Sequence, residues 1–253
     1  NDSAYEAALS LHKSGTKINA IVDIRNNSSS EIVNKVKSLG VQIYWNHTII
    51  DTKGYKRINK VIVMKLNDNG NDVVGKKIEF NCDCLAISGG WTPMVHLFTQ
   101  SGGKLKFDNK DNIFIPDKSN LAQLSIGSAK GDFELDDVLK NSIEDTKKFL
   151  KIESSNFDNI DVKCSKEKEK KNIWLLPSDR PLSKTKPFLD YQNDSTAKDV
   201  KLALREGFKS IEHVKRYTTT GMRTDQGKLA NMHALGIVAD TTKTNMREIA
   251  TTT

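Results

Sequence analysis

Groups suited to holding a phosphate are concentrated between residues 212 and 228. Guanidinium and ammonium groups supply positive charge, and threonine hydroxyls supply hydrogen-bond donors, which together suit phosphate oxygens. The cations are Lys215, Arg216, Arg223 and Lys228, and the hydroxyls belong to Thr218, Thr219, Thr220 and Thr224. The pattern predicts a phosphate-binding loop, and a surface loop with ordinary salt bridges is the alternative.

The residue types in this stretch also predict its secondary structure. Residues 218–221 are three threonines and a glycine, all of which disfavour helix, so the donors are expected in a loop between helices. His213 has no second metal-type ligand at helical spacing, and a structural role is expected for it.

A second candidate site lies in residues 127–135. Its small residues, Gly127, Ser128 and Gly131, allow the backbone to approach a ligand closely, and the start of the helix that follows is expected to attract anionic groups. A simple strand-to-helix turn is the alternative.

An acidic residue, Asp23, ends an early apolar run and could accept hydrogen bonds from a ribose. An exposed aspartate without a ligand is the alternative, and Arg25 beside it could face a phosphate or solvent. No G-x-G-x-x-G fingerprint of a dinucleotide site is present.

The three cysteines cannot all pair, and Cys82 and Cys84 are too close in sequence for a usual zinc site, which needs two residues between ligands. The expectation is therefore a reduced, cytoplasmic protein without a structural metal.

The elements that position these residues alternate in the first 150 residues. Helices are expected at 4–14 and 30–40, with Ser3 and Glu6 at capping-box spacing, and each is followed by an apolar strand, at 18–24 and 41–45. This succession of helix, glycine and strand predicts a parallel sheet.

The pattern then changes to short alternating segments, which predict an antiparallel hairpin within residues 47–80 with a turn at 67–70. Further strands are expected at 84–87, 113–116 and 124–127, and a helix at 136–151. The strand at 84–87 runs into two glycines, as at a ligand-binding carboxyl end of a sheet.

The remainder divides into a polar linker, residues 151–185, and a helical part, residues 186–253. The linker includes an apolar island at 173–177 and the run Lys163–Lys171, where lysine alternates with glutamate; this run indicates a solvated segment and not nucleic-acid binding. Helices are expected at 197–208, 210–217 and 229–240, the first framed by Thr196 and Asp199.

Composition and charge restrict the classes of protein to which the chain could belong. The 253 residues are 37% hydrophobic, and no apolar run approaches the roughly 20 residues of a membrane span. The net charge of +7 comes mostly from the C-terminal part, because residues 1–150 carry 20 basic and 18 acidic groups and residues 151–253 carry 19 and 14. No signal peptide is recognised, and the ends at Asn1 and Thr253 suggest an internal piece of a longer polypeptide.

Several motifs resemble the α subunit of the heterotetrameric sarcosine oxidase family. They occur in the same order as in that subunit, at residues 1–5, 88–97, 127–131, 190–194, 204–208, 212–222 and 224–228. The resemblance implies an α/β fold: residues 1–150 would form part of a glutathione-reductase-like dinucleotide-binding domain. Residues 186–253 would form a small all-helical module similar to an iron-free bacterioferritin-associated ferredoxin.

The resemblance also implies cofactors and partners. Family members oxidise sarcosine with O2 and tetrahydrofolate to glycine, methylenetetrahydrofolate and hydrogen peroxide. They use NAD in this subunit, FMN at the boundary with the β subunit and FAD within β, and they assemble from α, β, γ and δ subunits. The implied NAD contacts are Gly127, Ser128, Gly131, Phe133 and Leu135, and the implied FMN contacts are Lys215, Arg216, Thr218, Thr219, Thr220, Gln226 and Lys228.

No catalytic residue is assigned to this chain. The family's glycine fingerprint would precede Asn1, and its folate-binding domain would follow Thr253. Two alternatives remain: a subunit of a related amine or opine dehydrogenase, and a nucleotide-binding assembly module without a redox role. Such dehydrogenases carry cysteine ligands for an iron-sulfur cluster in the small module, whereas residues 186–253 contain no cysteine.

Overall fold

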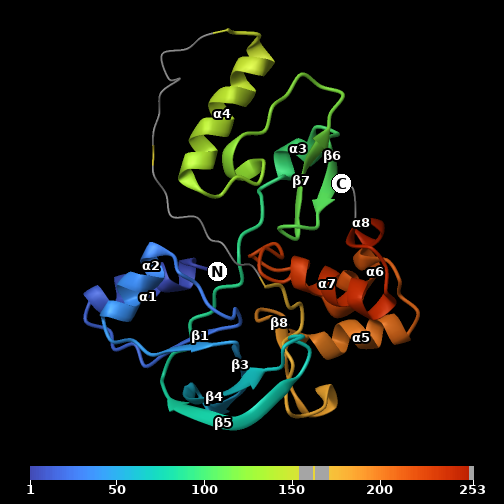
Figure 1. Ribbon diagram of the computed structural model, residues 1–253. Coiled ribbons are helices and arrows are strands. Elements are labelled where there is room, and N and C mark those ends of the chain that lie inside the picture. The colour runs from blue at the N-terminus through green and yellow to red at the C-terminus, as the bar shows by residue number, and fades with distance from the viewer. Residues whose placement is uncertain (154–161, 163–170, 251–253) are drawn as a thin grey trace. The chain divides into compact units, whose positions relative to one another are not determined.

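The computed structural model describes residues 1–153, 162 and 171–250 (Figure 1). These residues form two compact units. The described part of the first consists of residues 1–88 and 171–250, and that of the second of residues 89–153 and 162. Apart from Lys171, the run Lys163–Lys171 lies outside the described residues.

The first unit begins with a small parallel α/β layer. Its elements are α1 (Ser3–Lys13), β1 (Ile21–Asp23), α2 (Glu31–Ser38) and β2 (Ile43–Trp45). The two strands are parallel, with Ile21 opposite Ile43, and buried apolar side chains from both helices pack against them. The predicted alternation of helix and strand is confirmed, because the apolar residues of each helix recur at the helical period and face one core.

The start of α1 differs from the expectation. Asp2 is the residue at the cap position, and α1 has no side-chain cap hydrogen bond. The hydroxyl of Ser3 instead donates to the Asn1 side chain at 2.7 Å and lies 2.7 Å from the Ser88 hydroxyl. The predicted capping box is therefore wrong, because Ser3 already lies within the helix.

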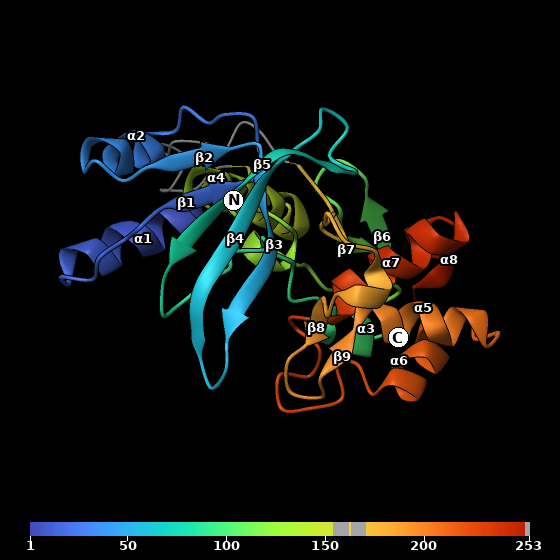
Figure 2. The same ribbon diagram turned by 90° about the horizontal axis from the view of Figure 1, so that it is seen from below.

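A three-stranded antiparallel sheet follows, in the order β3–β4–β5 (Figure 2). The strands are β3 (His47–Gly54), β4 (Ile58–Leu66) and β5 (Val73–Asn81). The predicted hairpin is confirmed as β4 and β5, and β3 extends it. Ile50, Ile62 and Met64 form a buried cluster on this sheet, with Val73 packed against it.

The expected strand at 84–87 is not formed. This segment has no ladder partner among the described strands, and Ile87 is 72% exposed. A strand requires a neighbour for its backbone groups, and the segment's apolar composition does not reveal whether one is present. The adjoining Ser88 hydroxyl bonds to the side chain of Asn1 at 2.5 Å.

The second unit contains α3 (His96–Gln100), the antiparallel pair β6 (Lys104–Asp108) and β7 (Ile113–Lys118), and α4 (Leu135–Leu150). The strand predicted near 113–116 and the helix predicted at 136–151 are confirmed. The strand predicted at 124–127 is wrong: residues 121–126 have no ladder, and Gly127, the first residue of the 3-10 turn η1 (Gly127–Ala129), has a positive φ that is incompatible with extended backbone.

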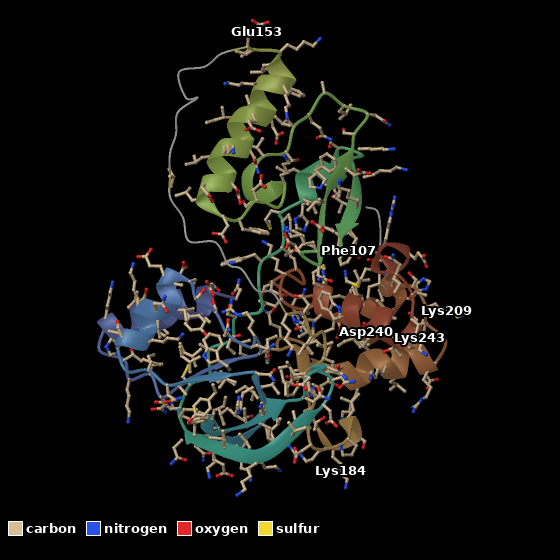
Figure 3. All side chains as sticks on the ribbon, viewed as in Figure 1. Phe107, Glu153, Lys184, Lys209, Asp240 and Lys243 are labelled. Carbon is tan, nitrogen blue, oxygen red and sulfur yellow. The ribbon has the colours of Figure 1, made fainter. Side chains whose placement is uncertain are left out.

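The C-terminal part of the first unit is mainly helical. Its elements are η2 (Leu182–Lys184), β8 (Phe188–Asp190), β9 (Ser195–Thr196), α5 (Ala197–Arg205), α6 (Ile211–Thr218), α7 (Asn231–Thr242) and α8 (Met246–Ile249). As predicted, Thr196 and Asp199 frame α5: the backbone N–H and the hydroxyl of Thr196 donate to the Asp199 carboxylate at 2.8 and 2.7 Å. Lys184, Lys209 and Lys243 lie on the outside of the ribbon (Figure 3).

Residues 171–180, which we call the strap, contact both the helices and the sheets of the first unit. The Trp174 ring packs so closely on α7 that a Cβ added to Gly236 would lie 2.2 Å from it. On the other side, Lys171 donates to the Asn46 side chain at 3.0 Å. Ion pairs of 2.7 and 2.5 Å join Arg180 to Asp51 and Asp179 to Lys77. The apolar island expected within the linker therefore makes packed contacts.

Candidate functional site

The phosphate-binding candidate is built from two loops, residues 190–194 and 218–228, which we call the polar loop pair. Asp190, only 3% exposed, ends β8 and joins the two loops. Its carboxylate accepts hydrogen bonds from the backbone N–H groups of Gly221, Gln192 and Asn193 at 2.8, 2.9 and 3.0 Å. Burial acts to raise the pKa of Asp190, but these hydrogen bonds outweigh it and hold the pKa below its usual value.

Two amide side chains add further links between the loops. Gln192 Oε1 accepts from the backbone N–H and the hydroxyl of Thr224, at 3.1 and 2.8 Å. Asn193 donates to the Thr219 carbonyl at 2.7 Å and accepts from Arg223 Nε at 2.8 Å. The residues after Asp190 thus fix the second loop, a role that sequence reasoning missed although they formed part of a recognised motif.

Two of the predicted phosphate donors face inward. Thr218 and Thr220 are buried, and their hydroxyl oxygens lie 2.7 Å apart. The Thr218 hydroxyl also donates to the Val214 carbonyl at 2.8 Å. Thr219 is exposed, in the left-handed region at φ 57°, and its hydroxyl donates to the Thr218 carbonyl. In this geometry Thr218 and Thr220 stabilise the end of α6.

Two glycines enclose Asn231 at the start of α7. Gly221 and Gly227 have φ angles of +71° and +74°, and a Cβ at either position would lie 2.2 Å from an Asn231 amide atom. The second loop therefore requires glycine at both positions, for its conformation and for the space that Asn231 fills.

Side-chain cations remain available around the loop. Arg216 and Lys228 are exposed and have no ion pair within the described ranges, whereas Lys215 is half-buried and lies 3.8 Å from the Glu212 carboxylate. The backbone N–H groups of Met222, Gln226 and Lys228 already donate to Thr219, Arg223 and Asp225 carbonyls. For a phosphate such as that of FMN, the charge would therefore come from the side chains of Lys215, Arg216 and Lys228 and not from a cradle of free backbone amides.

The NAD candidate lies in the second unit. Gly127 and Gly131 have φ angles of +60° and +109°, and a Cβ on Gly131 would lie 3.0 Å from Ile115. Ser128 and Leu135 are exposed, and Phe133 is half-buried. The predicted residues thus lie in the segment that leads from η1 to the first residue of α4, Leu135.

The start of α4 is acidic. Glu134 is at the cap position, Asp136 and Asp137 lie in the first turn, and the Asp137 N–H donates to the Asp136 carboxylate at 2.9 Å. Acidic side chains are favourable at a helix start, where they occupy the position that an external anion would take, so the predicted attraction of an anionic group to this turn stays a prediction.

Asp23 is buried, and its carboxylate is held by neighbouring side chains of the protein. It is 8% exposed, and its carboxylate accepts from the Tyr5 hydroxyl at 2.8 Å and from Arg25 Nη2 at 2.7 Å. Arg25 is 3% exposed and also pairs with Asp2 at 2.9 Å. Burial acts to raise the pKa of Asp23, but hydrogen bonds from Arg25 and Tyr5 lower it overall. The alternative of an exposed aspartate is wrong, and the carboxylate is already engaged inside the protein.

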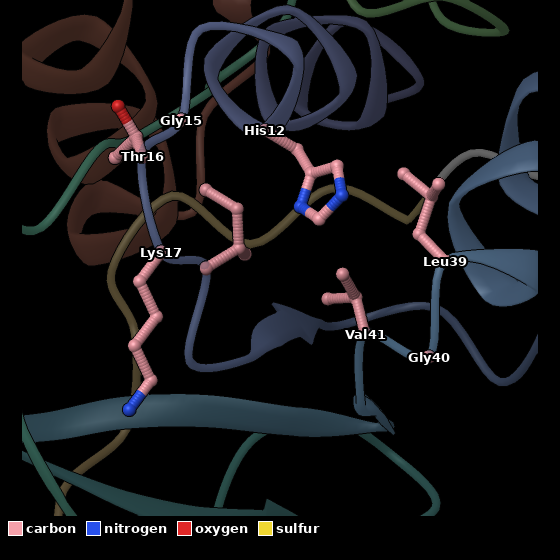
Figure 4. A pocket seen from close by; sticks show the side chains of 8 residues that line it. His12, Gly15, Thr16, Lys17, Leu39, Gly40 and Val41 are labelled. Carbon is pink, nitrogen blue, oxygen red and sulfur yellow. The ribbon is translucent and has the colours of Figure 1, made fainter.

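A hollow of 260 Å³ lies between the ends of α1 and α2 (Figure 4). His12, Lys17, Leu39 and Val41 line it, and the connections into β1 and β2 form its wall. It therefore lies at the amino ends of the parallel strands, opposite the carboxyl ends where ligands bind in open α/β sheets. It coincides with neither candidate site.

The described residues hold neither a cluster of metal-type ligands nor a membrane-spanning helix. No three side chains of His, Cys, Asp or Glu there are grouped as metal ligands. No helix in that part of the chain has the length and apolar character to span a bilayer.

Comparisons with known proteins support the expected resemblance. Residues 184–253 match the family model described as "Sarcosine oxidase A3 domain". Two relatives named "Sarcosine oxidase subunit alpha" come from Corynebacterium species. That of strain P-1 is 32% identical over 100% of this chain and 27% of its own length. That of strain U-96 is 31% identical over 94% of this chain and 25% of its own length. The relative from Rhizobium meliloti (strain 1021) is 30% identical over 100% of this chain and 24% of its own length. The chain thus spans about a quarter of these relatives.

A solved structure shares the fold. The crystal structure of L-proline dehydrogenase from P. horikoshii has a TM-score of 0.52 and 16% identity, covering 92% of this chain and 47% of that one. At this identity the likeness concerns the fold alone, and it agrees with the mixed α/β class predicted from the sequence.

Proposed function

Since the chain is homologous over its full length to α subunits of sarcosine oxidase, as the sequence motifs predicted, we propose that it performs the corresponding part of that subunit's work. The proposed enzyme is an oxidoreductase that oxidatively demethylates sarcosine with O2 and tetrahydrofolate. Its products are glycine, methylenetetrahydrofolate and hydrogen peroxide, and its partners are β, γ and δ subunits. The observation that carries the proposal is the 30–32% identity, which extends across both candidate sites.

Within that enzyme the polar loop pair would contact FMN, which accepts electrons when bound. The cations Lys215 and Arg216 at the end of α6 and Lys228 on the second loop would neutralise its phosphate, and Gln226 and Thr219 lie exposed on the second loop. Thr218 and Thr220 would act by holding the loop, because their hydroxyls bond within the protein.

The turn at residues 127–135 would contribute to NAD binding. Gly127 and Gly131 shape its backbone, Ser128 offers a hydroxyl, and Phe133 and Leu135 offer apolar surface. FAD in the β subunit and tetrahydrofolate in a further domain belong to the proposed assembly and not to residues of this chain.

The two alternatives are a subunit of a related amine or opine dehydrogenase and a non-catalytic nucleotide-binding module. The absence of cysteine from residues 186–253 disfavours the iron-sulfur-containing dehydrogenases. Sarcosine-dependent formation of hydrogen peroxide distinguishes the proposed oxidase from the non-catalytic nucleotide-binding module.

The test is to express the full-length polypeptide with its partner subunits and to measure flavin content and sarcosine-dependent hydrogen peroxide. Lys215→Ala combined with Arg216→Ala should lower the bound FMN at least about threefold, because each removes a charge that offsets the phosphate. Arg205→Ala, at an exposed cation on α5, is the control and should retain full flavin content. Normal FMN content and activity in the double variant would exclude the proposed contact.

A further inference from the structure

The turn between β3 and β4 forms an exposed basic tip at the free end of the sheet (Figure 2). The basic tip consists of residues 53–57, and all five are exposed. Gly54 makes the turn possible, since its φ is +148° and a Cβ there would lie 2.0 Å from the Arg57 carbonyl oxygen. The pairing of Gly54 with Ile58 leaves Tyr55, Lys56 and Arg57 as the loop.

Positive charge is concentrated at this tip. Residues 53–57 contain three cations and no acidic residue: Lys53, Lys56 and Arg57. Farther along the sheet, lysines are neutralised, because Lys60 pairs with Glu79 and Lys77 with Asp179, each at 2.5 Å. Within the described part of the chain, neither Lys56 nor Arg57 has an ion pair.

The aromatic side chain at the tip has no role in the core. Tyr55 is 96% exposed, so its ring contributes little to the stability of the fold. Tyrosine and arginine together are enriched in protein–protein interfaces and among the residues that dominate their binding energy. Single-stranded nucleic acid would need a groove that follows several nucleotides, with successive aromatic platforms, whereas the tip has one aromatic ring on a three-residue loop.

We infer that the basic tip docks onto an acidic surface of another subunit of the same assembly. The inference rests on the proposed function, which makes this chain part of a multi-subunit enzyme, and the relatives are themselves named as subunits. Tyr55 would supply contact area, and Lys53, Lys56 and Arg57 would select a partner of opposite charge and accelerate association.

The test compares the binding of purified full-length polypeptide to its purified partner subunits at low and high salt. Tyr55→Ala combined with Arg57→Glu should weaken the association at least about tenfold and reduce its salt dependence. The melting temperature should stay unchanged, because both side chains are exposed and unpaired with described residues. Lys110→Glu, at the turn between β6 and β7, is the control and should bind like the wild type.

Three results would overturn the inference. The first is an unchanged dissociation constant in the double variant while the wild type assembles, which leaves the proposed function intact. The second is that the double variant loses binding to a single-stranded oligonucleotide while its association with the partner subunits is unaffected. The third is failure of the wild-type polypeptide to associate with any partner subunit, which would also contradict the proposed function.

Discussion

Arg25 and Asp23 show how residues that suggest ligand binding can serve the fold. Aspartate at the end of a buried strand is compatible with a ribose contact, and the sequence left that role open. The partners that engage the carboxylate are Tyr5, 18 positions earlier, and Arg25, two positions later. The spacing of residues along a chain does not reveal such side-chain contacts, because rotamers and packing decide them.

Removing the cation should reveal the strength of this cluster. Arg25→Leu leaves the carboxylates of Asp23 and Asp2 without their shared partner, and loss of one member of a buried ion pair costs about 3–5 kcal/mol. The expected result is a melting temperature of the full-length polypeptide lower by several degrees. Arg205→Leu, at a 78% exposed side chain, should change it little. Equal melting temperatures for the two variants would refute a structural role for Arg25.

Asp190 is a second residue whose role depends on contacts formed only in the folded chain. Its motif was recognised, yet nothing in residue types indicated that its carboxylate would gather the N–H groups of both loops. The sequence likewise did not indicate that the predicted donors Thr218 and Thr220 face inward, because the identity of a threonine does not reveal whether its side chain is buried.

Elements were predicted well where the information is local. Helical periodicity located α1, α2, α4, α5, α6 and α7, and alternation located the β4–β5 hairpin. Strands were predicted wrongly at 84–87 and 124–127, because a strand depends on a neighbour that can lie anywhere in the chain. Of the two loops of the candidate site, only the second was predicted, at residues 218–221; the first loop, residues 190–194, and its pairing with the second were not predicted.

The glycines of the second loop provide a test at the scale of elements. Gly221→Ala should disrupt the loop, because it adds both strain at a positive φ, about 1–2 kcal/mol, and a clash with Asn231. Gly207→Ala is the matched control: its φ is also positive, at +98°, but no atom lies within 4 Å of the added Cβ. We expect a larger loss of FMN and a lower melting temperature in the first variant, measured in the assembled enzyme. An equal loss in the two would contradict the role of the Asn231 contact.

At the scale of the whole molecule, the strap connects parts that are distant in sequence. Its apolar island was the signal that sequence reasoning noted, but its contact surfaces on Gly236 and near Asn46 depend on the folded arrangement of the first unit. A segment with such partners cannot be distinguished from a linker by composition alone.

Trp174→Ala should detach the strap from α7. The half-buried indole loses its packing on Gly236 and its edge contact with His233, at a cost of about 2–3 kcal/mol. Amide hydrogen exchange should accelerate in residues 171–180 and in α7, and remain unchanged in β6 and β7. Trp91→Ala, at a 63% exposed ring, is the control. Unchanged exchange in α7 would show that the strap does not stabilise it.

The discontinuous first unit has a consequence for the order of events during synthesis. Residues 1–88 cannot complete their contacts until residues 171–180 emerge, about 80 residues later. At ~5–20 residues per second, this delay lasts roughly 4–16 s, during which the second unit can collapse on its own. Closing so long a loop makes the strap a late step in folding, and an unfinished first unit would be a natural substrate for chaperones.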